Sequence, residues 1–331
     1  MGLLLLGYIL ALLGRKISKM KNMKKFVLFG LSLAVTATLA ACGGGSDSGE
    51  GTQTDEGYVP KTLKVQFVPS QAAETLEAKA KPLEDLLEAE LDIPVEVSVS
   101  TDYNTIIEAM SSEQIDIGFL PPNAYVLANE QSDAKVLLQA QRYGVEQPGG
   151  KPTDELVDSY SSMIVVKTGS DIKNLEDLKG KTIATQDVTS SAGYVWPAAE
   201  MKKAGVDIEN SDITTVQVKG HDQAILSVLN GDVDAAFVFE DARNNVVKDV
   251  PDIFEKVEPM YITEPIPNDT ITARADMSPE WNKKIQDAFI AIGASEEGRQ
   301  IISDIYSHEG YVVSDDSNFD IVREYAKEVG Q

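Results

Sequence analysis

Segments with the pattern of strands and segments with the pattern of helices alternate along this chain from residue 63 onward. Apolar residues fall at every second position in 63–68, which is the period of a strand, and at helical spacing in 76–87, where Pro82 must bend or restart the helix. The alternation continues with strands at 95–99, 115–120 and 136–138 and with helices at 103–110 and after Asn123, which is suited to cap its helix. This order predicts an α/β fold with a mostly parallel sheet and helices on both faces.

A weak internal repeat suggests two such units. Residues 106–120 and 224–238 each read as a helix, a polar turn, and an apolar strand that contains an acid and a Phe. We therefore expect two similar α/β lobes, although helix-turn-strand units resemble one another in any α/β protein. Lobe 1 would comprise residues 61–162 and 270–331, and lobe 2 residues 163–269.

The remaining segments complete this domain plan. The polar stretch 144–159 contains Gly149-Gly150 and predicts a loop, and the pattern after residue 273 is purely helical. If these last helices pack back on lobe 1, the chain crosses between the lobes twice, near Tyr160 and near Asn268. Two crossovers predict a hinged cleft.

The N-terminal region has the pattern of a bacterial export signal. Lys24 and Lys25 precede an apolar core, and Leu39-Ala40-Ala41-Cys42 resembles a lipobox, in which the Cys becomes the lipidated N-terminus of the mature protein. Residues 1–42 are then a signal region whose true start is Met23, and Cys42 is the lipidation site; a chance Cys beside a signal peptide is the alternative. Residues 43–60, rich in Gly, Ser and acids, predict a flexible tether. We expect an extracytoplasmic protein, anchored by lipid to the bacterial cell membrane.

Composition excludes several classes of function. Formal net charge is −24, and residues 1–42 hold six of the 29 basic residues and no acid, so the remainder carries 23 basic against 53 acidic residues. Such a surface repels nucleic acid. With two histidines, one Cys, and no Walker A, G-x-G-x-x-G or G-x-S-x-G motif, no enzyme, metal site or cofactor is predicted.

Three consecutive hydroxyl residues, Thr189-Ser190-Ser191, follow the strand at 182–184 and lead through Ala192-Gly193 into a helix. A helix start has backbone N–H groups without partners and about half a positive charge. Hydroxyls and amides aimed at one point, with Gly193 permitting close approach, would form a seat for a small anion. An ordinary Ser N-cap is the simpler alternative. Pro197 must either bend this helix or mark its regular start.

The segment from Thr189 to Pro197 resembles the Ser-Thr-Ser-Gly-Tyr-x-x-Pro box of solute-binding proteins of ABC importers for phosphonate, phosphite and phosphate. Other pieces of the chain match the family in order, namely Asp102-Tyr103, Tyr160-Ser161-Ser162, Gly220-His221-Asp222 and Pro265 to Asp269. The resemblance covers residue 63 to the C-terminus and implies the two-lobed type II periplasmic-binding-protein fold. The box reads Thr-Ser-Ser with an extra Ala before Gly, which leaves open which hydroxyl meets which oxygen.

The resemblance also implies which residues bind the ligand. The phosphonyl oxygens would be held by nearby amides and by the side chains of Thr189, Ser190, Ser191, Tyr103, Tyr160 and His221. Asp269 would accept the proton of a P–OH group or face an amine, and Glu240 or Asp241 would hold an amino group. A phosphonate keeps a proton near neutral pH because its second pKa is about 6, whereas sulfate keeps none, so a buried carboxylate selects against sulfate.

We therefore expect a monomeric, lipid-anchored solute-binding protein. It would close about its hinge around a small phosphorus oxyanion and deliver it to the permease subunits of an ABC importer, without chemical reaction. The alternatives are the same fold with another anion such as a sulfonate, an extracytoplasmic hydrolase, and a structural lipoprotein or adhesin. The substituent on the anion is left open.

Overall fold

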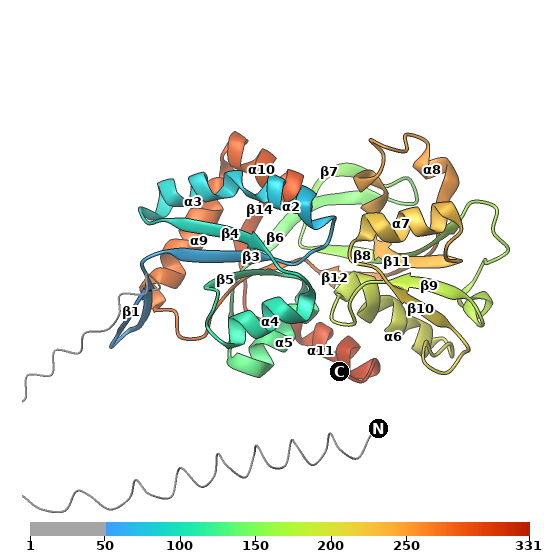
Figure 1. Ribbon diagram of the computed structural model, residues 1–331, viewed down its shortest axis with the longest axis horizontal. Helices are drawn as coiled ribbons and strands as arrows, with labels where there is room; N and C mark the ends of the chain where they lie inside the picture. The colour runs from blue at the N-terminus through green and yellow to red at the C-terminus, as the bar shows by residue number, and fades with distance from the viewer. Residues whose placement is uncertain (1–50) are drawn as a thin grey trace, which may run out of the picture. The chain divides into compact units, whose positions relative to one another are not determined.

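A computed structural model describes residues 51–331 (Figure 1). The signal region, Cys42 and the first part of the predicted tether lie outside the described residues. The described strands form a seven-stranded sheet, a five-stranded sheet and a small N-terminal hairpin. We call the larger sheet with its helices lobe 1 and the smaller sheet with its helices lobe 2. No helix within residues 51–331 is both long and apolar enough to span a membrane.

Lobe 1 has the strand order β14-β6-β13-β5-β3-β4, with β7 paired to β6. The bounds are β3 (Leu63–Phe67), β4 (Val95–Val99), β5 (Ile117–Leu120), β6 (Lys135–Glu146), β7 (Lys151–Val157), β13 (Thr270–Ala273) and β14 (Gly310–Val313). β3 is parallel to β4 and β5, whereas β13 and β14 run antiparallel to their neighbours.

Helices cover both faces of the lobe 1 sheet (Figure 1). One face carries α2 (Ala73–Ala80), α3 (Pro82–Leu91), α9 (Pro279–Ala294) and α10 (Glu296–Tyr306), and the other carries α4 (Tyr103–Ser111), α5 (Pro122–Ser132) and α11 (Asp320–Glu328). The helical spacing of 76–87 is confirmed, and Pro82 restarts the helix as the first residue of α3. Residues such as Leu83, Phe289 and Ile302 bury the first face in one apolar cluster. The second face is buried in another, which includes Ile106, Tyr125 and Val322.

Lobe 2 has the strand order β10-β9-β11-β8-β12. The bounds are β8 (Ser159–Lys167), β9 (Thr182–Thr185), β10 (Thr214–Gln217), β11 (Ala235–Phe239) and β12 (Val257–Pro267), with α6 (Trp196–Lys203), α7 (His221–Asn230) and α8 (Ile253–Lys256). The strands β10, β9 and β11 are parallel, and β8 is antiparallel to both β11 and β12. Short 3-10 turns lie at Leu175–Leu178, Ala242–Asn245 and, in lobe 1, Asp316–Phe319.

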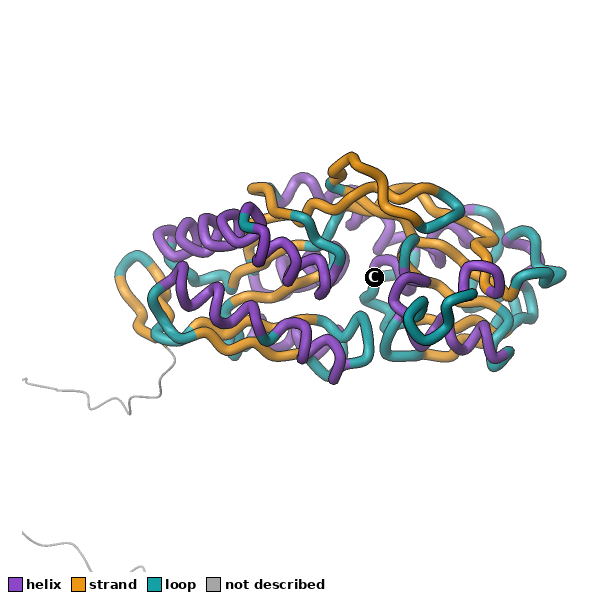
Figure 2. Tube along the Cα trace, turned by 90° about the horizontal axis from the view of Figure 1, so that it is seen from above, coloured by secondary structure: helices purple, strands orange, loops and turns teal. Residues whose placement is uncertain are grey.

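The chain passes between the lobes twice, and the two passages lie side by side. At the end of the β12–β8 ladder Pro267 pairs with Ser159, and three residues later Thr270 of β13 pairs with Gln139 of β6. Between them the Asn268 N–H donates to the Asp158 carbonyl at 2.8 Å. Figure 2 shows strands passing from one lobe to the other along one side. This is the expected two-lobed fold with two crossovers.

Some local predictions are wrong because strands without an apolar face leave no periodic signal. Residues 144–159, expected as a loop, belong to the antiparallel pair of β6 and β7, and most of β7 is exposed. Residues 51–60, expected as tether, form a hairpin of β1 (Gly51–Thr54) and β2 (Gly57–Pro60). The segment after residue 273 is not purely helical, because β14 pairs with β6.

The expected helix cap at Asn123 is also wrong. α5 begins at Pro122, because proline suits the first turn of a helix, where its missing N–H is not needed. The Asn123 side chain instead donates to the carbonyl of Thr189 in lobe 2, at 3.1 Å.

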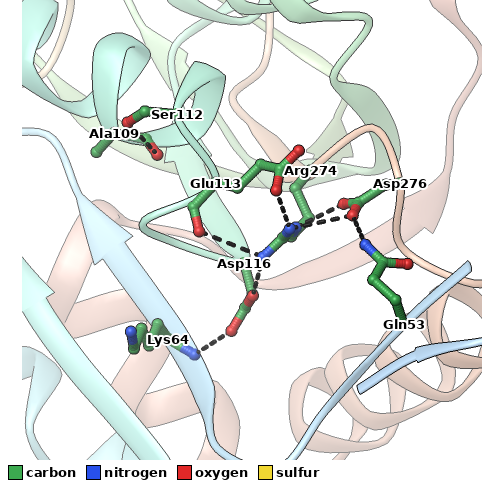
Figure 3. A network of polar contacts seen from close by, with 8 residues as sticks. All are labelled: Gln53, Lys64, Ala109, Ser112, Glu113, Asp116, Arg274 and Asp276. Atoms are coloured by element: carbon green, nitrogen blue, oxygen red, sulfur yellow. Dashed lines mark hydrogen bonds and ion pairs between the residues drawn. The ribbon is translucent and has the colours of Figure 1, made fainter. Parts of the chain in front are cut away.

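A buried ion-pair network attaches the N-terminal hairpin to lobe 1 (Figure 3). Arg274, directly after β13, donates to Asp116 at 3.3 Å, to Glu113 at 2.9 Å and to Asp276 at 2.6 Å. Gln53 of β1 hydrogen-bonds to the same Asp276. The chain from residue 51 is therefore part of the folded lobe, because a buried cation and its carboxylates hold it there.

Candidate functional site

A cavity of about 330 Å³ lies between the lobes, beside the crossovers. Tyr103 comes from lobe 1, Tyr160 from the start of β8, His221 from the start of α7, and Asp269 from the second crossover. All four line the cavity, although they belong to four separate segments of the chain. The structure thus brings together four of the residues that the family resemblance marks.

The hydroxyl box lies beside this cavity rather than in its wall. Ser190 caps a π-helical turn, Ser191–Val195, and its Oγ accepts from the Gly193 N–H at 3.1 Å. The Thr189 hydroxyl donates to Asp187 at 2.8 Å, and Ser191 Oγ accepts from the Asn123 N–H at 2.9 Å. All three hydroxyls therefore have partners in the protein.

Ala192 is the member of the box that lines the cavity. Within residues 51–331, the N–H groups of Ser191 and Ala192 have no hydrogen-bond acceptor, as befits the start of a helix. The turn runs directly into α6, and Pro197 near its first residue marks the regular start. These amides are the donors that the box presents.

Gly193 has a different role from the expected one. A Cβ at Gly193 would lie 2.0 Å from Oε1 of Gln186. The missing side chain is thus required by the packing of the box on Gln186, not by the approach of an anion.

The two tyrosines of the cavity are held as neutral hydroxyl donors. Asp102 caps α4 by accepting from the Thr105 N–H at 2.7 Å, which fixes Tyr103 in the first turn, and Tyr103 hydrogen-bonds with Ser190. Burial raises the pKa of Tyr103 and of Tyr160, and the negative charge of Asp269 raises both further. Both phenols therefore stay protonated at neutral pH.

His221 is a buried neutral base. Its side chain is 3% exposed, and burial lowers its pKa from 6.5 to about 3. Its Nδ1 has no hydrogen-bond partner among the described residues. Its backbone N–H donates to the Ser70 carbonyl of lobe 1 at 3.1 Å, and Gly220 before it lies against Gln71. His221 thus sits where the two lobes touch.

Asp269 has a neighbour that sequence reasoning missed. His308, also in the cavity wall, has its Nε2 3.6 Å from Oδ2 of Asp269. Its Nδ1 lies 3.2 Å from the hydroxyl of Tyr311, which stays protonated because burial raises its pKa, and the tautomer of His308 sets which of the two groups donates. No pattern in the chain marks His308, because its partners are remote in sequence.

Glu240 and Asp241 lie behind the wall rather than in it. Glu240 accepts from Gln147 Nε2 at 3.0 Å, and burial raises its pKa. Asp241 pairs with Arg142 at 2.5 Å. Arg142 itself lines the cavity and was missed because the predicted strand 136–138 ended before it. Extending the alternation through β6 would have reached it.

Within residues 51–331, no group of three or more His, Cys, Asp or Glu side chains could hold a metal ion. The candidate site is therefore built from hydroxyls, amides, an imidazole, a carboxylate and a guanidinium. Such a set can bind a small polar anion through many hydrogen bonds.

This chain is similar to known proteins in sequence and in fold. Residues 65–319 match the family model described as ABC transporter, phosphonate, periplasmic substrate-binding protein. The phosphate-import protein PhnD of Mycolicibacterium smegmatis is 28% identical over 264 residues, 77% of this chain and 79% of that protein. The phosphonates-binding periplasmic protein of Escherichia coli is 24% identical over 246 residues, 73% of this chain and 69% of that protein.

Two solved structures have TM-scores of 0.69 against this chain. One is a binding protein component of an ABC phosphonate transporter from Pseudomonas aeruginosa, at 22% identity, covering 80% of this chain and 85% of that one. The other is PhnD1 from Prochlorococcus marinus in complex with methylphosphonate, at 19% identity, covering 82% and 99%. At these identities the likeness shows the fold.

Proposed function

Because this chain belongs to the family of periplasmic substrate-binding proteins of ABC phosphonate transporters, we propose that it binds a phosphonate, phosphite or phosphate anion between its lobes. Members of this family are components of importers and not enzymes. The observation that carries the proposal is that Tyr103, Tyr160, Ala192, His221 and Asp269 all line one cavity. Those are the segments in which the family resemblance lies.

In this proposal the anion is held mostly by neutral donors. The free N–H groups of Ser191 and Ala192 start a helix, where a negative charge is stabilised. Ser190, Tyr103, Tyr160 and His221 add side-chain donors, while Thr189 and the Ser191 hydroxyl hold the box in shape. Neutral donors carry no cost of burying an isolated cation when the ligand is absent, and the guanidinium of Arg142 in the wall is paired with Asp241.

Asp269 then selects the phosphorus anion by its protonation. Its carboxylate lies in the cavity wall, 24% exposed, and accepts the proton of a P–OH group. Sulfate has no such proton and is repelled. His308 stands beside Asp269 and keeps the carboxylate oriented.

Binding would close the lobes about the two crossovers, with lobe 1 moving as one body and lobe 2 as the other. The first boundary, expected at residue 162, lies a few residues earlier, because β8 of lobe 2 begins at Ser159. The ligand would then pass to the permease subunits of the importer. In keeping with a binding protein that works outside the cytoplasm, we propose a monomer, tethered to the membrane by lipid on Cys42.

Calorimetric titration of two variants with methylphosphonate and sulfate tests this function. Ser190→Ala should weaken the binding of both anions alike, by about tenfold or more in the dissociation constant, because one charge-assisted hydrogen bond is lost. Asp269→Asn should instead reduce the difference between the affinities for methylphosphonate and sulfate, largely by strengthening the binding of sulfate. If wild type binds neither anion, the proposed ligand class is wrong. If Asp269→Asn leaves discrimination intact, Asp269 is only a turn residue.

A further inference from the structure

The cavity is larger than an oxyanion requires. In liquid water one molecule occupies about 30 Å³, so a cavity of about 330 Å³ has room for roughly ten. A tetrahedral phosphorus oxyanion has about half as many heavy atoms, so it leaves part of this volume free. The remaining space adjoins Phe239, Asn244 and Asn245 of lobe 2 and Arg142 of β6, which also belong to the wall. If the ligand carries a substituent on its phosphorus atom, these residues of the wall meet it.

Arg142 is a buried cation with an incomplete set of partners. Its side chain is 6% exposed, and its guanidinium lies 5.7 Å from the centre of the Tyr160 ring. One arm pairs with Asp241, but Nε has no hydrogen-bond partner among the described residues. A buried donor without an acceptor costs free energy. Nε itself has almost no exposed area, so a ligand in the cavity accepts from it only if the side chain shifts on binding.

The charge of Arg142 is firmly held. Burial alone would lower its pKa, but the nearby carboxylates of Asp241, Glu240 and Asp269 raise it above its ordinary value. Asp269 is part of the anion seat, so the guanidinium lies within electrostatic reach of the bound anion. Arg142 is therefore a permanent positive charge in the cavity wall.

The acids that an amine would need are already engaged. Asp241 pairs with Arg142, Glu240 accepts from Gln147, and neither lines the cavity. In the proposed function Asp269 accepts a hydrogen bond from the P–OH group, and its carboxylate lies beside His308. Asp304 does line the cavity, but it is exposed and accepts from Gln300, and exposed pairs contribute little.

From this geometry we propose that Arg142 restricts the site to phosphorus oxyanions whose substituent is uncharged and accepts a hydrogen bond, and that it excludes substituents with an ammonium group. The inference rests on the proposed function, and it names the class of substituent that the function leaves open. A hydroxyl, ether or carbonyl oxygen fits; an aminoalkyl group does not.

Two electrostatic effects oppose each other here, and direct contact decides between them. Glu240, Asp241 and Asp269 together outweigh Arg142 in charge and attract an ammonium group at long range. An ammonium group buried in the cavity, however, loses its water and needs acceptors within hydrogen-bond distance. At the Arg142 wall it meets the guanidinium first, a like charge with donors only.

The test uses two phosphonates that differ only in the charge of the substituent. Calorimetric titration compares 2-hydroxyethylphosphonate with 2-aminoethylphosphonate, with methylphosphonate as the reference for the anion seat. Wild type should bind the hydroxyethyl compound at least about tenfold more tightly than the aminoethyl compound. Arg142→Met keeps a similar length without charge. This variant should lower the ratio of the affinity for the hydroxyethyl compound to that for the aminoethyl compound about tenfold, or reverse it. The reason is that no positive charge then offsets the attraction of Glu240 and Asp241 for the ammonium group.

Arg243→Met is the matched control. Arg243 is also a buried arginine whose Nε has no hydrogen-bond partner among the described residues, but it does not line the cavity, and its other nitrogens donate to the backbone carbonyls of Val257 and Pro148. The control should lose stability and keep the wild-type ratio. Asp241→Asn is a second variant in case Arg142→Met fails to fold. It removes the partner of Arg142 and should raise the ratio.

The outcomes separate the two proposals. If none of the three phosphonates binds wild type, the proposed function fails and this inference fails with it. If methylphosphonate binds but wild type holds both larger compounds equally, only the inference is overturned. An equal change of the ratio in the Arg142 and Arg243 variants also overturns it, because Arg142 then acts through structure alone.

Discussion

Arg274 in lobe 1 and Arg142 beside the cavity are equally inaccessible, at 5% and 6% exposed, yet their surroundings differ. Arg274 meets three carboxylates and stacks on Tyr58, with its guanidinium 3.8 Å from the ring centre. Within the part of the chain that the structure describes, Arg142 pairs with one carboxylate and its buried Nε has no hydrogen-bond partner.

The difference separates a structural charge from a functional one. A buried cation that is fully paired holds two parts of the chain together and has nothing left to offer a ligand. A cation that is partly paired, in the wall of a cavity, costs free energy until a ligand supplies the missing acceptor. The neutral side chain of His221 resembles that of Arg142 in one respect. It also lines the cavity, and its buried Nδ1 has no hydrogen-bond partner among the described residues.

The largest effect should come from removing the structural charge. Arg274→Met leaves Asp116 buried at 2% exposure without its cation, so the free energy of unfolding should fall by about 3–5 kcal/mol. Affinity for methylphosphonate should stay within about twofold, because Arg274 lies outside the cavity wall. Urea unfolding and calorimetry measure the two quantities.

Lys283→Met is the control for this comparison. Lys283 pairs with Asp287 on an exposed helix face, at 66% and 60% exposure, and its loss should change stability by less than about 0.5 kcal/mol. A loss of stability in Arg274→Met as small as in this control would remove the distinction between the two buried arginines.

A smaller effect should appear in the pH dependence of stability. The pKa of His221 is about 3 in the folded protein, against the ordinary histidine value of 6.5 that applies to the unfolded chain. The unfolded chain therefore binds one more proton between these pH values, and stability falls as the pH is lowered through that window. Between pH 7 and pH 5 the contribution of His221 falls by about 2 kcal/mol. His221→Gln should lack this part of the dependence, and identical pH profiles in urea unfolding would refute the assignment.

The smallest effect should come from Thr189. Neither Thr189 nor Ser190 lines the cavity, but the Thr189 hydroxyl already donates to Asp187, whereas Ser190 accepts from the Gly193 N–H and hydrogen-bonds with Tyr103 of the cavity wall. Thr189→Val should therefore change the dissociation constant for methylphosphonate less than about threefold, against about tenfold or more for Ser190→Ala. Equal losses in calorimetry would mean that Thr189 meets the anion directly.

The alternation of strands and helices could be predicted from the sequence because buried faces impose periods of two and 3.6 residues on apolar side chains. The segments around Tyr103, Ser190, His221 and Asp269 could be recognised because each is a local motif at an element end. The hairpin of β6 and β7 could not be predicted, because an exposed strand is held by its backbone ladder alone.

What the sequence determined by itself is the two-lobed α/β plan, since the alternation of strands and helices depends on neighbours along the chain. The family resemblance marked the segments of Tyr103, Tyr160, His221 and Asp269, and folding brings these four residues to one cavity. What only the tertiary structure decided is which polar groups are already engaged. Arg142 meets Asp241, His308 meets Asp269, and Asn123 meets Ser191 across long stretches of sequence. The physical reason is that the state of a buried charge depends on the partners that folding brings to it, and no local pattern records them.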